Sequence, residues 1–217
     1  MHYRSRETAA KATVQEIRIL GGRAIAIAAD LAVPDQAVRM CEAAMSELGA
    51  VDLLVNNAGR YRASSVDDET PEHLAAMLRD NLQTTFNVTW AVHRSMLEKG
   101  FGRIVNVASG AAFFRSPNTP PSYAAAKAAV VALTKAWAAG WGGRNVRVNC
   151  VAPGFIDTEA NDQVPAAVRE RLIAQTPQSR AGEAREIADA IVFLLSDASA
   201  FINGQTISVC GGRVMLP

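Results

Sequence analysis

A tyrosine and a lysine separated by four positions carry the strongest chemical signal in the chain, in the run Ser122-Tyr123-Ala124-Ala125-Ala126-Lys127. On a helix this spacing places both side chains on the same face, one turn apart. A phenol normally titrates at roughly pH 10, and a nearby ammonium lowers that value because it favours the phenolate. The pair predicts an acid/base for alcohol–ketone chemistry. A surface tyrosine and lysine on an ordinary helix are the alternative for this pair alone.

Two further residues are placed to assist the pair. Ser109 follows a short apolar run that precedes the Tyr123 helix, so its hydroxyl could hold a substrate carbonyl oxygen that Tyr123 protonates. Ser116 and Ser122 compete for this role, but neither directly follows a strand. Asn81 stands mid-helix, where a short amide has poor propensity. It is either a structural residue or the anchor of a water that links Lys127 to solvent.

Helical periodicity alternates with short apolar runs along the chain. The pattern predicts helices over residues 7–20, 34–48, 71–97, 123–141 and 184–195, and strands over residues 24–29, 51–55, 104–108, 146–151 and 206–209. Apolar strands separated by helices indicate a parallel sheet covered on both faces. We therefore expect a doubly wound, Rossmann-like α/β fold in a single domain over residues 1–217.

In such a sheet, ligands bind beyond the carboxyl ends of the strands. This rule selects Asp30-Leu31, Asn56 to Gly59, Ser109-Gly110 and Pro153 to Thr158 as candidate site segments.

Taken together, these residues resemble the short-chain dehydrogenase/reductase family, in the branch of the 3-oxoacyl-carrier-protein reductases. Any one motif is weak, the Tyr-x-x-x-Lys pattern especially, but several in register at strand ends are specific. The motifs follow the family's order and approximate spacing from about Tyr3 to Arg213, and they are Asn57-Ala58-Gly59, Asn81, Ser109, Tyr123-x-x-x-Lys127 and Pro153-Gly154.

The resemblance implies a role for each matching position. Tyr123 is similar to the family's general acid/base, and Lys127 is similar to the lysine that lowers the pKa of that tyrosine and bonds the nicotinamide ribose. Ser109 resembles the family's substrate-polarising serine, and Asn81 resembles the residue that completes the proton relay. The implied activity is hydride transfer between nicotinamide and a small alcohol or carbonyl substrate, with Tyr123 exchanging a proton with the substrate oxygen. The implied cofactor contacts are Asp30 and Leu31 beside the adenine, Asn57, Ala58 and Gly59 along the cofactor, Tyr123 and Lys127 at the ribose, and Pro153, Gly154, Ile156 and Thr158 at the nicotinamide carboxamide.

The choice between NADP and NAD depends on the residues after the first short strand. Arg4 and Ser5 occupy the position where a basic residue pairs with a 2′-phosphate, whereas an Asp there would bind the free ribose hydroxyl of NAD. We therefore expect NADP, with NAD as the alternative. A solvated terminal arginine is the other interpretation of Arg4.

Composition excludes several other functions. The net charge of +1, with 22 basic and 21 acidic residues, argues against a nucleic-acid surface. Cys41, Cys150 and Cys210 are far apart and lack metal-ligand spacing, which favours buried thiols in a reduced, cytoplasmic protein. No apolar run has the length of a membrane span, and no metal site is expected. The acidic run Asp67-Asp68-Glu69 is interpreted as a solvated loop.

One family element is absent from the chain as given. The family opens with a buried strand and a glycine-rich turn that grips the cofactor's pyrophosphate at a helix N-terminus. Gly21-Gly22 precedes a strand instead of following one, so it cannot do this. Without a central first strand, we expect residues 24–29 to be disconnected from residues 51–55, with unpaired backbone groups along both.

Two explanations of this departure stay open. In the first, the start is wrong or the chain is a fragment of a normal enzyme. In the second, the protein is a catalytically inactive, truncated homologue that acts as an oligomerising or partner-binding protein. The resemblance implies homodimer or homotetramer surfaces on the helices over residues 71–97 and 123–141, and on the helix over residues 184–195 with the last strand.

Overall fold

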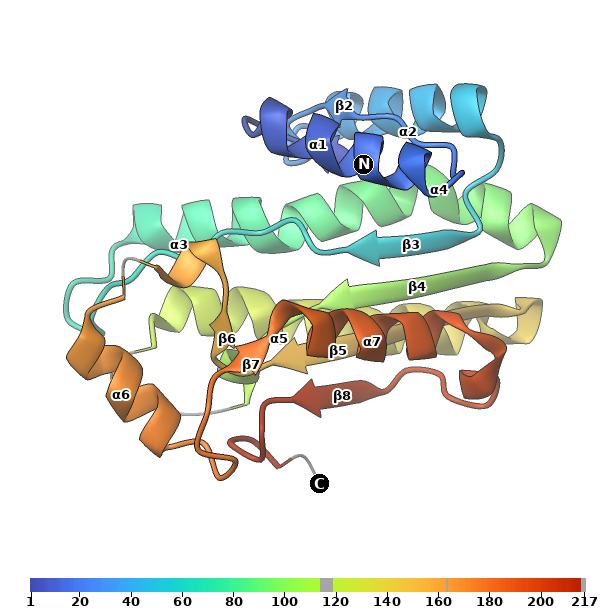
Figure 1. The fold of residues 1–217 in the computed structure, drawn as a ribbon. Helices are drawn as coiled ribbons and strands as arrows, with labels where there is room; N and C mark the ends of the chain where they lie inside the picture. Colours follow the sequence, from blue (N-terminus) through green and yellow to red (C-terminus); the bar gives the residue numbers. More distant parts are fainter. Residues whose placement is uncertain (114–118, 163, 216–217) are drawn as a thin grey trace.

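Four parallel strands form the main sheet of the computed structural model, which describes residues 1–113, 119–162 and 164–215. The strands lie side by side in the order β3-β4-β5-β8 and point the same way (Figure 1). They are β3 (Leu53–Asn56), β4 (Gly102–Val107), β5 (Val146–Pro153) and β8 (Thr206–Val209). In the middle of the sheet, Val105 is the register partner of Val55 on one side and of Asn149 on the other.

Helices cover both faces of this sheet, as the sequence predicts. Helices α4 (Thr84–Lys99) and α5 (Pro121–Trp141) lie on one face, and α7 (Ala184–Leu195) lies on the other (Figure 1). Because both faces are covered, β4 and β5 are buried along almost their whole length and are mainly apolar, with Arg103, Asn106, Arg147 and Asn149 as their buried polar residues. The expected doubly wound parallel fold is confirmed.

A second, two-stranded parallel sheet lies apart from the first. It contains β1 (His2–Tyr3) and β2 (Ile27–Ala28), followed in the chain by α1 (Glu7–Ile19) and α2 (Pro34–Leu48) respectively. Among the described residues, no strand pairs with the free edge of β3, and Leu53 and Val55 are 52% and 40% exposed. The expected separation of residues 24–29 from residues 51–55 is confirmed.

The predicted helix over residues 71–97 is divided into three segments. It begins as α3 (Pro71–Met77), widens into the π-helix η1 (Leu78–Gln83) and continues as α4. Thr70 caps the start, since its side chain accepts a hydrogen bond from the His73 backbone N–H. The prediction of one regular helix was therefore wrong at η1, and π segments of this kind are frequent at functional sites.

Several shorter elements complete the described fold. The predicted strand over residues 24–29 pairs only at Ile27–Ala28, because its neighbour β1 is itself two residues long. The remaining elements are the strands β6 (Ile156–Asp157) and β7 (Gly182–Glu183), the helix α6 (Ala166–Ala174), and the 3₁₀ turns η2 (Gly110–Ala112), η3 (Gly142–Arg144), η4 (Glu159–Asn161) and η5 (Asp197–Ser199).

A buried polar network joins the sheet to the helices beneath it. The Asn56 side chain donates to Thr89 at 2.9 Å and to Asn106 at 2.8 Å, and Asn106 donates in turn to Thr134 at 2.8 Å. The four residues belong to β3, α4, β4 and α5 and are all buried. Because buried amides are costly to leave unpaired, this network fixes the strand ends relative to α4 and α5.

Candidate active site

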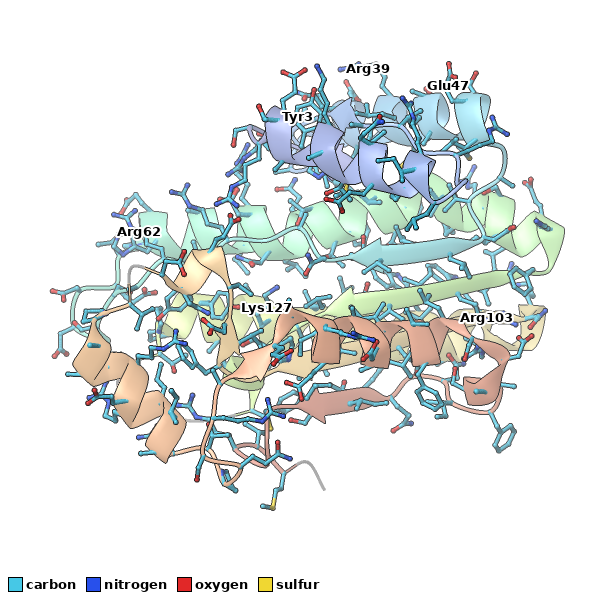
Figure 2. The ribbon with its side chains drawn as sticks, in the orientation of Figure 1. Tyr3, Arg39, Glu47, Arg62, Arg103 and Lys127 are labelled. Atoms are coloured by element: carbon cyan, nitrogen blue, oxygen red, sulfur yellow. The ribbon has the colours of Figure 1, made fainter. Side chains whose placement is uncertain are left out.

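A cavity of about 220 Å³ opens at the carboxyl ends of β4 and β5. It brings together most of the candidate residues, as expected for the strand ends of a parallel sheet. Figure 2 shows Lys127 at this end of the sheet and Arg103 at the opposite end. The cavity is lined by Asn57, Gly59, Arg60, Tyr61, Asn81, Val107, Ala108, Ser109, Tyr123, Lys127, Pro153, Gly154, Ile156 and Asn161.

Tyr123 and Lys127 project from the first turns of α5, which begins with Pro121. The Lys127 ammonium lies 5.8 Å from the centroid of the Tyr123 ring and donates to the Val107 carbonyl at 2.9 Å. Ser109 lies two residues after β4 and caps the turn η2, where its hydroxyl oxygen accepts from the Ala111 backbone N–H at 3.1 Å. Phenol, amine and hydroxyl therefore share one wall of the cavity.

Burial dominates the electrostatics of this pair. Desolvation raises the pKa of the Tyr123 phenol, and the Ser109 hydroxyl acts against it without reversing the shift. Desolvation also lowers the pKa of Lys127 to about 8, although the nearby Cys150 opposes this. The expected lowering of the Tyr123 pKa by Lys127 is wrong, because burial destabilises the charged forms of both groups.

Asn81 is 1% exposed inside η1, and its side chain is fully engaged. Its amide oxygen accepts from the Arg60 backbone N–H at 3.1 Å, and its amide nitrogen donates to the carbonyls of Arg60 at 2.8 Å and Met77 at 3.1 Å. The side chain thus clamps the loop after β3, as expected for the structural role that was one of the two interpretations of Asn81. A Cβ at Gly59 would lie 2.6 Å from the Asn81 oxygen, so only glycine fits beside this clamp.

The candidate adenosine contacts lie at the ends of β1 and β2, in a chain of ion pairs. Arg4 contacts Asp80 at 3.3 Å, and Arg79 contacts both Asp80, at 2.9 Å, and Asp30. Partial burial would raise the pKa of Asp30, but the Ala32 N–H and the Arg79 guanidinium outweigh it and lower the pKa.

Ser5 and Leu31, which follow Arg4 and Asp30 in the sequence, differ in their exposure to solvent. Ser5 is exposed, whereas Leu31 is 6% exposed and belongs to the hydrophobic core. The Leu31 side chain therefore supports the end of β2, and a ligand at this position would meet Arg4 and Asp30 first.

The loop after β5 is held by close backbone packing. The Gly154 N–H donates to Val209 at 3.0 Å, and a Cβ at Gly154 would lie 2.8 Å from the Cβ of Cys210. Ile156 pairs with Gly182 in the small sheet of β6 and β7. This packing presents Pro153, Gly154 and Ile156 to the cavity, while Thr158 lies further along the loop, outside the residues that line it.

Five lining residues were missed as site residues by the sequence analysis, namely Arg60, Tyr61, Val107, Ala108 and Asn161, of which Val107 and Ala108 were predicted only as part of a strand. Arg60 and Tyr61 directly follow Asn57-Ala58-Gly59, so the turn itself was the signal that they project toward the cavity. Asn161 lies in a region without a local pattern, where it donates to the Ile156 carbonyl at 2.7 Å. The competitor Ser116 lies outside the described residues.

Glu69 also departs from its expected environment. The loop 67–69 was expected to be solvated, but Glu69 accepts from the Ser122 backbone N–H at 3.1 Å and from the Ser64 hydroxyl. Partial burial would raise the pKa of Glu69, but hydrogen bonds from Ser122 and Ser64 outweigh it and lower the pKa. Glu69 thereby anchors the first turn of α5, one residue before Tyr123.

The described residues fit the two ends of a nicotinamide dinucleotide. Arg4 and Asp30 could hold the adenosine, and Tyr123 and Lys127 line the cavity where the nicotinamide ribose would lie. No described glycine after a strand opens a helix longer than the three-residue turn η2, so the described part of the chain provides no pyrophosphate grip of that kind. Within the same residues, no group of three or more His, Cys, Asp or Glu side chains forms a metal site.

Comparison with known proteins places this geometry in a family. Residues 1–213 match the family model described as enoyl-(acyl carrier protein) reductase. The chain is 38% identical over 202 residues to the 3-oxoacyl-acyl-carrier-protein reductase FabG of Thermotoga maritima, covering 93% of this chain and 82% of that protein. It is 38% identical over 203 residues to the (2S)-[(R)-hydroxy(phenyl)methyl]succinyl-CoA dehydrogenase subunit BbsD of Thauera aromatica, covering 94% and 81%.

A solved structure agrees with this assignment. The gluconate 5-dehydrogenase of Burkholderia cenocepacia, in complex with NADP and tartrate, superimposes with a TM-score of 0.90 at 37% identity, covering 98% of this chain and 84% of that one. The chain therefore belongs to this family of short-chain dehydrogenases/reductases. It is an NAD(P)-dependent oxidoreductase by class, and the comparisons favour this over a catalytically inactive homologue.

Proposed function

We propose that the protein is an NADP-linked reductase or dehydrogenase of small alcohol/carbonyl pairs, with Tyr123 as its general acid/base. The observation that supports this most directly is the single cavity shared by Ser109, Tyr123 and Lys127 at the carboxyl ends of β4 and β5. A phenol, a hydroxyl and an amine in one pocket form a set suited to protonating a carbonyl oxygen.

In this mechanism the bound nicotinamide supplies or accepts the hydride. The Ser109 hydroxyl donates to the substrate carbonyl oxygen, and the Tyr123 phenol gives that oxygen its proton. Lys127 holds positive charge beside Tyr123, donates to the Val107 carbonyl and would bond the cofactor ribose with a remaining N–H. Asn81 holds the Arg60 peptide and so fixes the far wall of the cavity.

The test follows NADPH oxidation at 340 nm with ethyl acetoacetate, the simplest ester of the 3-oxoacyl class. This probe is chosen because several relatives are named 3-oxoacyl-acyl-carrier-protein reductases. We expect Tyr123→Phe to lower kcat by about 10² to 10⁴-fold and to leave NADPH affinity nearly unchanged. Retained turnover in Tyr123→Phe would reject Tyr123 as the acid.

The preference for NADP is proposed from Arg4. It is 45% exposed and shares the Asp80 carboxylate with Arg79, so two guanidinium groups lie together where a phosphomonoester could bind. We expect Arg4→Ala to weaken NADPH binding roughly tenfold and to leave NADH binding within about twofold. Equal weakening for both cofactors would reject a 2′-phosphate contact. Both NADPH and NADH should be titrated, because the structure of a Brucella melitensis relative contains bound NAD.

We also propose that the protein is a homodimer or homotetramer. An aromatic ladder runs along α4 and α5, and at its exposed end Phe86 and Trp90 stack at 6.1 Å and are 41% and 55% exposed. The buried His93 and the half-buried Trp137 and Trp141 continue the ladder, with Trp137 and Trp141 5.6 Å apart. Exposed apolar patches of this kind mark interaction surfaces. Sedimentation of Trp90→Glu should then show a smaller species than the parent chain.

Cytoplasmic location, a single domain over residues 1–217 and a small-molecule substrate complete the proposal. The three cysteines are free and buried, which is compatible with a reducing compartment. No helix within the described residues combines the length and apolar character needed to cross a bilayer.

A further inference from the structure

Two tyrosine rings meet inside the cavity. The rings of Tyr61 and Tyr123 lie edge to face, with centroids 5.1 Å apart and planes at 86°. This is a favoured geometry for an aromatic pair, because the positive edge of one ring meets the negative face of the other. Tyr61 is 52% exposed and Tyr123 is half-buried, and both residues line the cavity.

The loop that carries Tyr61 is fixed by a buried side chain. Asn81, which is 1% exposed, accepts from the Arg60 N–H at 3.1 Å and donates to the Arg60 carbonyl at 2.8 Å. The residue before Tyr61 is therefore clamped on both sides of its backbone. Close packing of Gly59 against the Asn81 oxygen holds the preceding residue as well. Tyr61 thus starts from an anchored backbone and is not a free loop side chain.

We infer that Tyr61 is a positioning residue, whose ring keeps the Tyr123 phenol directed into the cavity and shields it from bulk water. This inference rests on the proposed role of Tyr123 as acid/base. Lys127, at 5.8 Å from the ring centroid, and the Ser109 hydroxyl are the other neighbours of Tyr123. Without the Tyr61 ring, Tyr123 would lose its aromatic contact and its ring could rotate toward solvent.

The charged and titratable groups around Tyr123 come from several elements. Lys127 lies on α5, and Cys150 on β5 interacts with Lys127. Arg60 lines the same cavity, and Glu69 bonds the start of α5 at Ser122. Substitution at Tyr61 leaves all four groups in place, so any change in Tyr123 titration reports the loss of the ring or of its phenol.

The first experiment needs neither cofactor nor substrate. The chain contains three tyrosines, Tyr3, Tyr61 and Tyr123, so in a Tyr3→Phe, Tyr61→Phe background the only phenol is Tyr123. We expect its pKa, read from ultraviolet absorbance of the phenolate, to stay above the ordinary value of roughly 10. With Tyr61→Ala in the same background, the pKa should fall toward that value because water reaches the phenol. An identical pKa in the two proteins would overturn the inference.

The second experiment measures turnover with NADPH and ethyl acetoacetate. Tyr61→Phe should keep kcat within about twofold of the parent, whereas Tyr61→Ala should lower kcat about 10- to 100-fold and change KM less than threefold. A rise in KM with unchanged kcat would overturn the inference, since Tyr61 would then be only a pocket wall. Tyr61→Leu, which keeps apolar bulk, replaces Tyr61→Ala if the latter does not fold and should also lower kcat. Phe201→Ala, at a ring fully exposed on the surface, is the control and should match the parent.

The two proposals fail in different ways. If Tyr123→Phe retains turnover, the proposed function has failed. If Tyr123→Phe is inactive while Tyr61→Ala turns over like the parent, the proposed function stands and Tyr61 has no positioning role.

Discussion

Gly59→Ala tests whether the centre of the site is as tightly packed as the structure indicates. A Cβ at this position would lie 2.6 Å from the Asn81 oxygen and 3.3 Å from the Lys127 nitrogen. Neither neighbour can move freely, because Asn81 is held by three hydrogen bonds and Lys127 by the Val107 carbonyl. Overpacking of this kind costs about 1–3 kcal/mol. If Asn81 swings away instead, three hydrogen bonds of about 1 kcal/mol each are lost, which leads to the same range.

Urea denaturation followed by far-ultraviolet circular dichroism measures this cost as a lower midpoint at constant slope. Gly140→Ala is the matched control, since Gly140 lies in α5 with no atom within 4 Å of the added Cβ. Alanine should stabilise that helix by about 0.5–1 kcal/mol. If Gly59→Ala unfolds within about 0.5 kcal/mol of the parent, the close contact with Asn81 and the clamp built on it are refuted.

Three further substitutions test the surroundings of the site. Lys127→Met removes an amine whose pKa is about 8 in the folded protein, below its ordinary value. Between these two pKa values the unfolded chain binds more protons than the folded chain, so the free energy of unfolding of the parent should rise by roughly 1–3 kcal/mol relative to the variant from pH 7 to pH 10. A difference in urea midpoints that does not change with pH would contradict this. Thr134→Val leaves the Asn106 amide without its acceptor and should cost about 1–3 kcal/mol in the same assay, whereas no cost would mean that the network is not closed. Glu69→Gln should cost less than about 1 kcal/mol at pH 7, and this difference should vanish as the pH falls through the lowered pKa of Glu69, because the parent carboxyl then becomes neutral too.

Apolar periodicity was sufficient to predict the main sheet and its covering helices. Val105 and Val148 are fully buried because β4 and β5 are covered on both faces, and this is the property that their apolar runs encode. The same logic placed Ser109 and Pro153 at strand ends, where both line the cavity. Periodicity could not predict η1, since Asn81 prefers no particular helix type and its clamp on Arg60 depends on a contact 21 residues away.

Contacts between distant loops explain the other missed residues. Glu69 was assigned to solvent because three consecutive acidic residues usually form a hydrated surface. Its contact with the start of α5 spans 53 residues and exists only in the folded chain. Tyr61 follows the same principle, since its neighbour Tyr123 is set by the docking of α5 against the loop after β3. Local patterns therefore identify the strand ends but not the side chains that close over them.

The electrostatics of the cavity keep the Tyr123 phenol protonated at neutral pH. Desolvation raises the pKa of Tyr123, so in the proposed mechanism the phenol holds at pH 7 the proton that it would give to a carbonyl oxygen. The reverse reaction needs a phenolate to accept the alcohol proton, and that form becomes populated only as the pH rises. We therefore expect kcat for carbonyl reduction with NADPH to change little between pH 6 and 8, and kcat for alcohol oxidation with NADP to rise steadily from pH 7 to 10. Ethyl 3-hydroxybutyrate and ethyl acetoacetate are suitable probes for the two directions. If alcohol oxidation is equally fast across this range, the acid/base is a group other than the buried phenol of Tyr123.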